Sequence, residues 1–286
     1  MIGILYESDE WSSYALAENI RNMGVDVYLF NTEEEIDHEK LFSCCLVVNR
    51  VFASSQFRGH QRSLKKMPEI ISLLKEKAIP MINPYQAHEY EINKALSTKT
   101  LETHGIAVPK VFGIVARSTV QCLKAEYPCI LKPNCGGRTN FTYIIHNEDE
   151  FRKAMEEIPD IEMIEEEYIK PVFGYVTRIE VIDRQCQLIL KRSVAANGLS
   201  AYHLGSTYER YDDCSGKIKE TAMRAMDILE IETGSMDIIE NEQGFFIIDV
   251  NSVSNASEDN TEMFQFDLMM ETAKYVVKKY KDSEFA

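Results

Sequence analysis

Two short apolar segments near the C-terminal end constrain the fold most, because each carries an acidic residue where a buried strand is expected. They cover residues 235–240, Ser-Met-Asp-Ile-Ile-Glu, and 245–251, Phe-Phe-Ile-Ile-Asp-Val-Asn. The link between them, Glu-Gln-Gly at 242–244, predicts a three-residue hairpin turn with its glycine in the left-handed conformation. In that register Asp237 lies directly opposite Asp249.

The acidic residues of this hairpin share a face with an amide. Successive strand residues point to opposite faces, so Asn251 lies on the same side as Asp249, and Asp237 joins them from the other strand. Carboxylates set among Ile, Val and Phe are costly unless a cation compensates them. An all-oxygen set suits Mg²⁺, which also binds substrate phosphates. The hairpin therefore predicts a nucleotide–magnesium site. The alternative is a pair of ordinary edge-strand acids that face solvent.

Composition narrows the class of protein. The chain has 286 residues, enough for two or three modest domains, and a formal net charge of −15, which argues against general nucleic-acid binding. No apolar run is long enough to span a membrane, and the N-terminal segment lacks the basic start of a signal peptide. The seven cysteines show no metal-binding spacing, and we expect a reducing, cytoplasmic location.

The first third of the chain alternates between strand and helix patterns, which predicts a parallel α/β sheet. No Gly-x-Gly-x-x-Gly follows the first strand, so this layer is not expected to bind a dinucleotide. A helix is expected at 86–104, closed by Gly105. Strands then predominate, and helices are expected at 147–157, 215–229 and 262–280.

A lysine and a glycine-bearing loop form a candidate phosphate site. Lys132 ends an apolar strand, and residues 133–139 continue as Pro-Asn-Cys-Gly-Gly-Arg-Thr. Backbone amides made accessible by glycine can bind phosphate oxygens, and a nearby lysine adds positive charge. The alternative is an ordinary Gly-Gly turn between two strands.

Two further segments fit a nucleotide. Three glutamates at 165–167 precede Tyr168 and predict a domain hinge whose backbone pairs with an adenine edge, although Glu165 itself is expected to be solvated. In the next strand Arg178 and Glu180 share a face, and Lys191-Arg192 follows in the strand after it. Cations on this sheet suit a polyphosphate. The alternative is a structural Arg–Glu pair.

The order of these motifs resembles the ATP-grasp superfamily of carboxylate–amine ligases over almost the whole chain. It is most similar to the branch of the ribosomal-protein glutamate ligases and the amino-group-carrier ligases of lysine and arginine biosynthesis. The resemblance implies an α/β and α+β protein with the ATP-grasp fold. It implies an N-terminal parallel α/β domain at 1–88. A central subdomain with a lid loop is then expected at 89–168, and a C-terminal subdomain with the magnesium site at 169–286. The last two would clasp ATP.

The resemblance also assigns roles to individual residues. Arg178 and Arg192 would hold the acyl-phosphate oxygens or the carboxylate. The hairpin residues Asp237, Asp249 and Asn251 would bind one or two Mg²⁺ or Mn²⁺ ions. The implied ATP-binding residues are Lys94, Lys132, Gly136, Gly137, Arg138, Glu166, Glu167, Tyr168, Ile169, Lys191 and His203.

The chain departs from the family pattern most in the lid loop, defined here as residues 135–141. The family has Ser/Thr-x-Gly-x-Gly there, whereas this chain has fewer and displaced glycines. Arg138 either supplies a charged contact in place of a lost backbone one, or the loop closes less well. The family asparagine near His203 is replaced by Ala201, and Asp249 replaces a commoner glutamate.

The sequence indicates fewer residues for substrate binding than for nucleotide binding. Arg50 and Ser54 follow a buried strand, where α/β sheets place ligand loops, and Asn255 follows the metal-site hairpin. The expected function is an ADP-forming ligase that joins an amino acid to a small molecule or a peptide end. One alternative is a ligase that acts on a precursor peptide. A chain of this length leaves little room for the leader-binding domain that such a ligase would need. Another is a non-catalytic nucleotide-binding protein. A homo-oligomer, dimer or tetramer, is expected.

Overall fold

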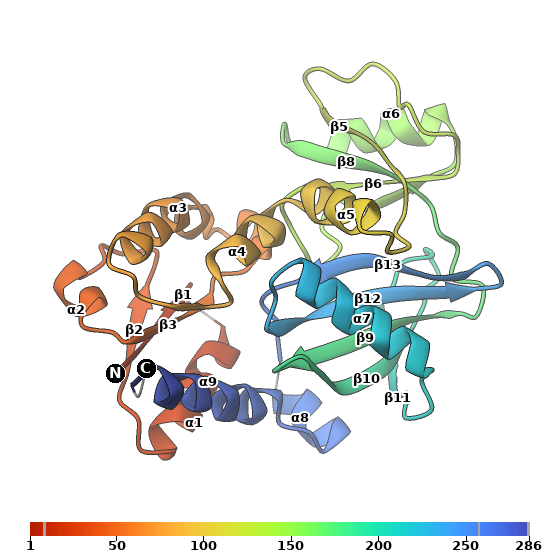
Figure 1. The fold of residues 1–286 in the computed structure, drawn as a ribbon. Helices are drawn as coiled ribbons and strands as arrows, with labels where there is room; N and C mark the ends of the chain where they lie inside the picture. The colour runs from red at the N-terminus through yellow and green to blue at the C-terminus, as the bar shows by residue number, and fades with distance from the viewer. Residues whose placement is uncertain (8–9, 257, 285–286) are drawn as a thin grey trace.

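The computed structural model describes residues 1–7, 10–256 and 258–284. The chain forms three β-sheets, each in a separate part of the sequence, with helices packed against them (Figure 1). This mixture of a parallel sheet with two antiparallel sheets is the arrangement that the resemblance implies.

The N-terminal sheet is parallel and has the order β2-β1-β3-β4. Helix α1 packs on one face through Leu16 and Ile20, and α3 packs on the other through Met67, Ile70 and Leu74. Because both faces are covered, the strands are apolar almost throughout. The elements are β1 (Ile2–Tyr6), α1 (Trp11–Asn22), β2 (Val27–Asn31), α2 (His38–Phe42), β3 (Leu46–Arg50), the 3₁₀ helix η1 (Ala53–Phe57), α3 (Gln61–Glu76) and β4 (Met81–Ile82).

The helix expected at 86–104 is two helices, α4 (Tyr85–Ile92) and α5 (Lys94–Thr103). The break falls at Asn93, whose side-chain oxygen accepts a hydrogen bond from the Leu96 amide at 3.0 Å. Asparagine is a strong N-cap, so it begins a new helix where the apolar pattern alone predicts continuation. Because of this break, Lys94 is the first residue of α5, and its side chain projects from the N-terminal end of the helix.

The central sheet is antiparallel, with the order β5-β8-β6-β7, and α6 packs on one of its faces. Asn147 caps α6 by accepting a hydrogen bond from the Glu150 amide at 3.0 Å, as its sequence pattern indicates. The elements are β5 (Val111–Ala116), β6 (Cys129–Pro133), β7 (Tyr143–Ile145), α6 (Glu148–Glu157) and β8 (Glu162–Glu167).

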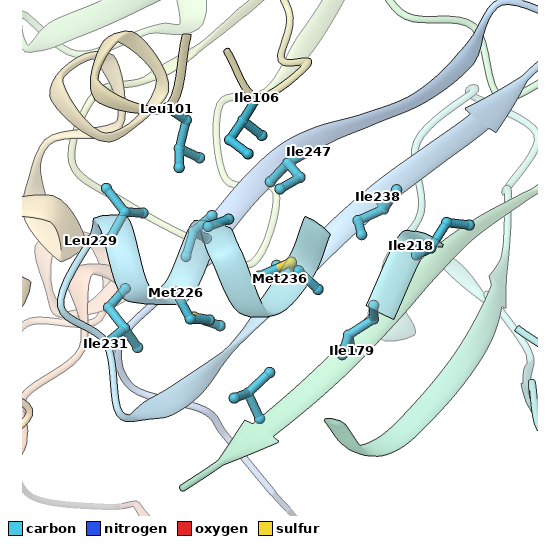
Figure 2. Packing of buried hydrophobic residues seen from close by; sticks show 14 of the residues in the cluster. Leu101, Ile106, Ile179, Ile218, Met226, Leu229, Ile231, Met236, Ile238 and Ile247 are labelled. Atoms are coloured by element: carbon cyan, nitrogen blue, oxygen red, sulfur yellow. The ribbon is translucent and has the colours of Figure 1, made fainter. Parts of the chain in front are cut away.

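The C-terminal sheet is antiparallel, with the order β11-β10-β9-β12-β13, and α7 covers one face (Figure 1). Figure 2 shows Met226 and Ile218 of α7 against Met236, Ile238 and Ile179 of the strands. Strand alternation therefore directs the intervening residues to the opposite, uncovered face. The elements are β9 (Tyr175–Ile182), β10 (Gln185–Ser193), the 3₁₀ helix η2 (Tyr202–Leu204), β11 (Tyr208–Arg210), α7 (Gly216–Ile228), β12 (Thr233–Asn241) and β13 (Gly244–Asn251).

Strands β12 and β13 pair in the predicted register, but the turn that connects them is shorter than predicted and β13 contains a bulge. Asn241 pairs with Gly244, so the turn has two residues, and Gly244 begins the strand with a positive φ of 141°, which glycine tolerates. A bulge then leaves Ile248 unpaired, because Ile238 pairs with Ile247 and Asp237 with Asp249. The shorter turn and the extra residue compensate each other.

The last helical segment also differs from expectation, since it is divided into α8 (Glu258–Phe264) and α9 (Leu268–Glu284). Helix α9 packs beside α1 on the N-terminal sheet, through Met269, Ala273 and Val276 (Figure 1). The C-terminal end of the chain thereby ties the first sheet to the third. Every helix in the described part of the chain is too short or too polar to cross a lipid bilayer.

Candidate active site

A cavity of about 610 Å³ opens on the uncovered face of the C-terminal sheet. The central sheet and the first residues of η1 form its other walls. Most of the residues predicted for nucleotide, metal and substrate binding line it: Ser54, Lys94, Lys132, Gly136, Gly137, Arg138, Glu166, Glu167, Tyr168, Ile169, Arg178, Arg192, His203, Asp237, Asp249, Asn251 and Asn255. Residues far apart in the sequence thus meet in one place.

The three predicted metal ligands lie at the centre of this cavity. Asp237 and Asp249 are cross-strand partners, and the Asn251 amide donates to the Asp249 carboxylate at 3.4 Å. Asp237 is 7% exposed, and it reaches the cavity because Met236 and Ile238 turn toward α7. The hydrophobic packing of the strand therefore fixes the direction of the carboxylate.

A lysine from α5 compensates the second carboxylate. Lys94 is buried, and its ammonium group forms an ion pair and hydrogen bond with Asp249. Burial alone would lower the pKa of Lys94, but Asp249, with Glu91 and Glu166, raises it above its ordinary value. Lys94 is therefore a permanent cation next to the candidate metal site.

The second predicted phosphate lysine comes from the central sheet. Lys132 Nζ lies 2.7 Å from Glu166 Oε2 and donates to the Ile248 carbonyl at 3.0 Å. That carbonyl belongs to the bulged residue of β13, so the bulge provides the contact between the two sheets. Lys132 and Lys94 thus approach the acidic hairpin from two different elements.

Two arginines compensate the first carboxylate. Arg178 Nη1 donates to Asp237 Oδ1 at 3.2 Å, and Arg192 Nη2 donates to Asp237 Oδ2 at 2.7 Å. Burial raises the pKa of Asp237, but Arg192 and Arg178 outweigh it and hold the pKa below its usual value. Arg178 also donates to Glu180 at 2.9 Å, so the structural Arg–Glu pair is present as well.

The donor set fits magnesium. Two carboxylates and an amide are hard oxygen ligands, and Mg²⁺ typically takes one or two carboxylates and completes its shell with water and phosphate oxygens. Within the described ranges, no group of three or more Asp, Glu, His or Cys residues could hold an ion by itself. The lysine and arginine side chains that pair with Asp237 and Asp249 show that the site requires positive charge.

The predicted adenine hinge lines one end of the cavity. Residues 166–169 connect the central sheet to β9, and Ile169 packs with Val176 and Ile239. The expectation for Glu165 was wrong, since this residue is fully buried and accepts a hydrogen bond from the Ala125 amide. Glu165 and Glu166 alternate across β8, which buries one against the central core and turns the other toward Lys132.

The lid loop is docked on both neighbouring parts of the molecule. Arg138 forms an ion pair with Glu10, and the Phe141 ring lies edge-on to Phe57 at 5.2 Å. On the other side, Thr139 Oγ1 lies 3.1 Å from His203 Nε2. The loop therefore adopts a closed position despite its unusual glycine pattern.

Lys191 does not belong to the site, which corrects the expectation for this residue. Its ammonium group lies 4.8 Å from the centre of the Tyr175 ring and 4.2 Å from that of Tyr211, on the face away from the cavity. Because β10 alternates, Arg192 and Lys191 cannot both point into the cavity.

The predicted substrate residues have different environments. Ser54 and Asn255 line the cavity, whereas Arg50 is not among its lining residues. Arg50 is buried and donates to the Ser254 carbonyl at 2.9 Å and to Ser12 at 2.8 Å. Arg50 therefore positions the loop that follows β13 instead of contacting a ligand directly.

Glu91, for which no sequence motif indicates a role, is buried at the cavity wall. Its carboxylate accepts hydrogen bonds from the Ala53 amide at 3.1 Å and from the Ser252 amide at 2.6 Å. Glu91 thereby links η1 to the loop after β13. These segments are far apart in the sequence, so no local sequence pattern indicates the contact. Ser200, which accepts a hydrogen bond from Arg192 at 2.9 Å, was also missed as an orienting group.

Comparison with known families identifies the arrangement. The pattern of the RimK-like ATP-grasp domain matches residues 91–278. The chain belongs to this family. The match contains α5, the lid loop, the hinge and the acidic hairpin, and it confirms the resemblance inferred from the motifs.

Individual relatives of this RimK-like ATP-grasp chain are distant. It is 28% identical over 179 residues to D-alanine–D-alanine ligase B of Clostridium perfringens, which is 57% of this chain and 57% of that protein. It is 24% identical over 194 residues to a probable alpha-L-glutamate ligase of Histophilus somni, which is 66% of this chain and 64% of the relative. The chain thus spans less than two thirds of the length of these relatives.

Solved structures confirm the ATP-grasp fold. The ATP-grasp ligase PsnB, in complex with a minimal precursor, superposes with a TM-score of 0.68 at 18% identity. The superposition covers 97% of this chain and 98% of PsnB. PsnB, whose structure was solved with a precursor, is thus similar in length to this chain. Chain length is therefore no reason to disfavour a ligase that acts on a precursor peptide.

Proposed function

We propose that this chain is an ATP-dependent carboxylate–amine ligase that forms ADP and joins an amino acid to a small molecule or a peptide end. One observation carries the proposal. Asp237, Asp249 and Asn251 meet Lys94 and Lys132 in a single cavity that ends at the hinge. Acids for a divalent ion, lysines for phosphates and an apolar slot for a base are the components of a nucleotide–magnesium site.

Each group has a role in this proposal. The backbone and apolar side chains of residues 166–169 would bind adenine, and Lys94 and Lys132 would bind the α- and β-phosphates. One or two Mg²⁺ ions on the acidic hairpin would neutralise the charge that develops on the β- and γ-phosphates. Glycines 136 and 137, with Arg138 and His203, would enclose the nucleotide when the lid loop is closed.

The reaction requires no nucleophile from the protein. A carboxylate oxygen of the first substrate attacks the γ-phosphorus of ATP, and the bond to the β-phosphate oxygen breaks, releasing ADP. The amine of the second substrate then attacks the acyl carbon, displaces phosphate and loses a proton. Arg178 and Arg192 would stabilise the oxygens of the transferred group, which is catalysis by position and charge. The closed lid loop would exclude water from the acyl phosphate.

The structure supports this pairing of roles, because Arg178 and Arg192 already bind a carboxylate, that of Asp237, at 3.2 and 2.7 Å. A divalent ion held by Asp237 would compensate this carboxylate, and the two guanidinium groups could then bind another anion. Ser54 and Asn255 line the side of the cavity where the carboxylate and amine would meet.

The likeness to PsnB favours a second candidate of the same chemistry, a ligase that acts on side chains of a precursor peptide. We also propose a cytoplasmic location, in agreement with the seven cysteines, all free thiols in the described part of the chain. A dimer or tetramer remains our proposal for the assembled protein.

The test is phosphate release with ATP and Mg²⁺ across a panel of amino acids, dipeptides and longer peptides, with mass spectrometry of the products. A new amide bond formed with stoichiometric ADP supports the ligase. Masses reduced by one water within a single peptide select the peptide-modifying candidate. Stabilisation by ATP without ADP release from any substrate pair would leave a non-catalytic nucleotide-binding protein.

A further inference from the structure

Two apolar clusters line different parts of the cavity, and only one of them is needed for a nucleotide. The first lies by the hinge and comprises Ile169, Val176, Ile239 and Ile248. The second comprises Leu190 of β10, Tyr208 of β11 and Phe264 of α8, and we call it the apolar wall. A ligand that bound only through adenine and phosphates would make no contact with the apolar wall.

The strand register places the apolar wall beside the reacting groups. Leu190 is the cross-strand partner of Arg178, and Tyr208 is the partner of Arg192. Arg192 in turn pairs with Val176, so a guanidinium group separates the two apolar regions. Since neighbouring strands lie roughly 5 Å apart, the apolar wall is within one side chain of the site proposed for the acyl group.

The apolar wall is a built surface. Phe264 is 6% exposed and packs on Leu188 and Leu190, and its ring centre lies 6.2 Å from that of Tyr208. Tyr202 continues the aromatic surface at 6.3 Å from Tyr208 and is 66% exposed at the rim of the cavity. Elements from three parts of the chain therefore converge on one apolar patch.

Charge in the cavity disfavours an acidic side chain at this position. Every lysine and arginine among the described lining residues already forms an ion pair: Lys94 with Asp249, Lys132 with Glu166, Arg138 with Glu10, Arg178 with Glu180 and Asp237, and Arg192 with Asp237. Bound nucleotide would engage the central cations. A substrate side-chain carboxylate would then meet Glu180, the partner of Leu188. Arg210, a cation that adjoins the apolar wall, is already engaged, because it donates to the Phe264 carbonyl at 3.3 Å and pairs with Asp212.

We propose that the residue joined by this chain carries an apolar side chain, and that this side chain packs against Leu190, Tyr208 and Phe264. The inference rests on the proposed ligase function and defines its substrate class. Burying a Leu- or Phe-sized side chain is worth roughly 1.5–3 kcal/mol, which corresponds to a preference of about 10- to 150-fold over a side chain that gains nothing there.

The experiment compares leucine and phenylalanine with glutamate and lysine, as free amino acids and at dipeptide ends. Two readouts are used: phosphate release with ATP and Mg²⁺, and thermal stabilisation with a non-hydrolysable ATP analogue. We expect kcat/KM for apolar substrates to exceed that for glutamate at least tenfold. Phe264→Ala and Tyr208→Gln should raise the KM for the apolar substrate about tenfold and leave the KM for ATP unchanged.

Met263→Ala is the matched control, because Met263 neighbours Phe264 on α8, is 56% exposed and is not a lining residue. Phe264→Leu should recover most of the affinity. A preference for glutamate overturns the inference and leaves the ligase function standing. Stabilisation by apolar amino acids without ADP release supports the apolar wall and refutes the ligase. If apolar substrates produce neither response, the inference fails.

Discussion

The acidic hairpin and the lid loop line the same cavity, but different forces hold them. In the hairpin, β12 pairs with β9, and Met236 and Ile238 pack against α7 (Figure 2). These contacts determine where Asp237 and its cross-strand partner Asp249 point. In the lid loop, contacts with Glu10, Phe57 and His203 determine the position of the chain. The hairpin is therefore set by regular structure, and the loop by side chains from distant segments.

The residues that replace glycine make this contrast sharper. Arg138, Thr139 and Phe141 have positive φ values of 57°, 53° and 50°. Side chains disfavour this left-handed region by roughly 1–2 kcal/mol per residue. Each of these residues also makes one of the contacts that dock the loop. The positions that lack glycine are thus the positions that attach the loop to its neighbours, and the attachment offsets the backbone strain.

The largest expected effect is on the hairpin. Asp249→Asn removes one of two carboxylates from the candidate metal site, and we expect ADP formation to fall at least roughly 100-fold, the scale of losing one well-placed electrostatic group. Circular dichroism should show an unchanged fold, since β13 keeps its pairing. Asp213→Asn, at an exposed position after β11, is the control. Unaltered turnover in Asp249→Asn would refute the metal assignment.

The hairpin was predictable because a period of two residues is a local property. Asn251 follows from Asp249 by alternation, and Asp237 follows from the expected hairpin register. The compensation between the shorter turn and the bulge at Ile248 left that register intact. The same rule should have excluded Lys191, which adjoins Arg192 and must point away from the cavity. The family pattern placed Lys94 and Lys132, although their carboxylate partners became visible only in three dimensions.

What the sequence did not predict depends on tertiary contacts. Glu165 was expected in solvent, but the segment around Ala125 covers it. Arg50 was expected to bind substrate, yet Ser12 and Ser254, from opposite ends of the chain, enclose its guanidinium group. The apolar wall joins β10, β11 and α8, and β11 was not recognised as a strand. The periodicity of apolar residues in the sequence does not indicate such contacts between distant segments.

The lid loop gives a smaller and more selective effect. Arg138→Ala removes the ion pair with Glu10, and we expect turnover to fall about tenfold, the scale of a 1.4 kcal/mol change, with little change in the affinity for ATP. The reason is that Arg138 docks the loop on the N-terminal domain. Glu10 also pairs with Arg58 at 2.8 Å, so a double variant with Glu10→Gln should be no worse than Glu10→Gln alone, because the Arg138 contact is already lost in that variant.

Stopped-flow measurement of ADP release and equilibrium binding of ATP separate the two effects of Arg138. Arg152→Ala is the control, since Arg152 is an exposed α6 residue that pairs with a surface glutamate, Glu148. If Arg138 instead contacts the phosphates directly, its loss would weaken ATP binding by the same factor as turnover, and the Glu10 variant would leave both unchanged.

The smallest effect compares strain at two positions with similar backbones. Thr139 and Glu230 have φ of 53° and 54°, but Thr139 bonds to His203 whereas Glu230 is exposed after α7. Glu230→Gly should raise the free energy of unfolding by up to about 1 kcal/mol, because it relieves the left-handed strain. Thr139→Gly relieves similar strain but loses a hydrogen bond worth roughly 0.5–1.5 kcal/mol, so its net change should be close to zero. Urea denaturation of both variants gives the two values. Equal stabilisation would mean that the Thr139 contact contributes nothing, and that other contacts, such as those of Arg138 and Phe141, hold the lid loop.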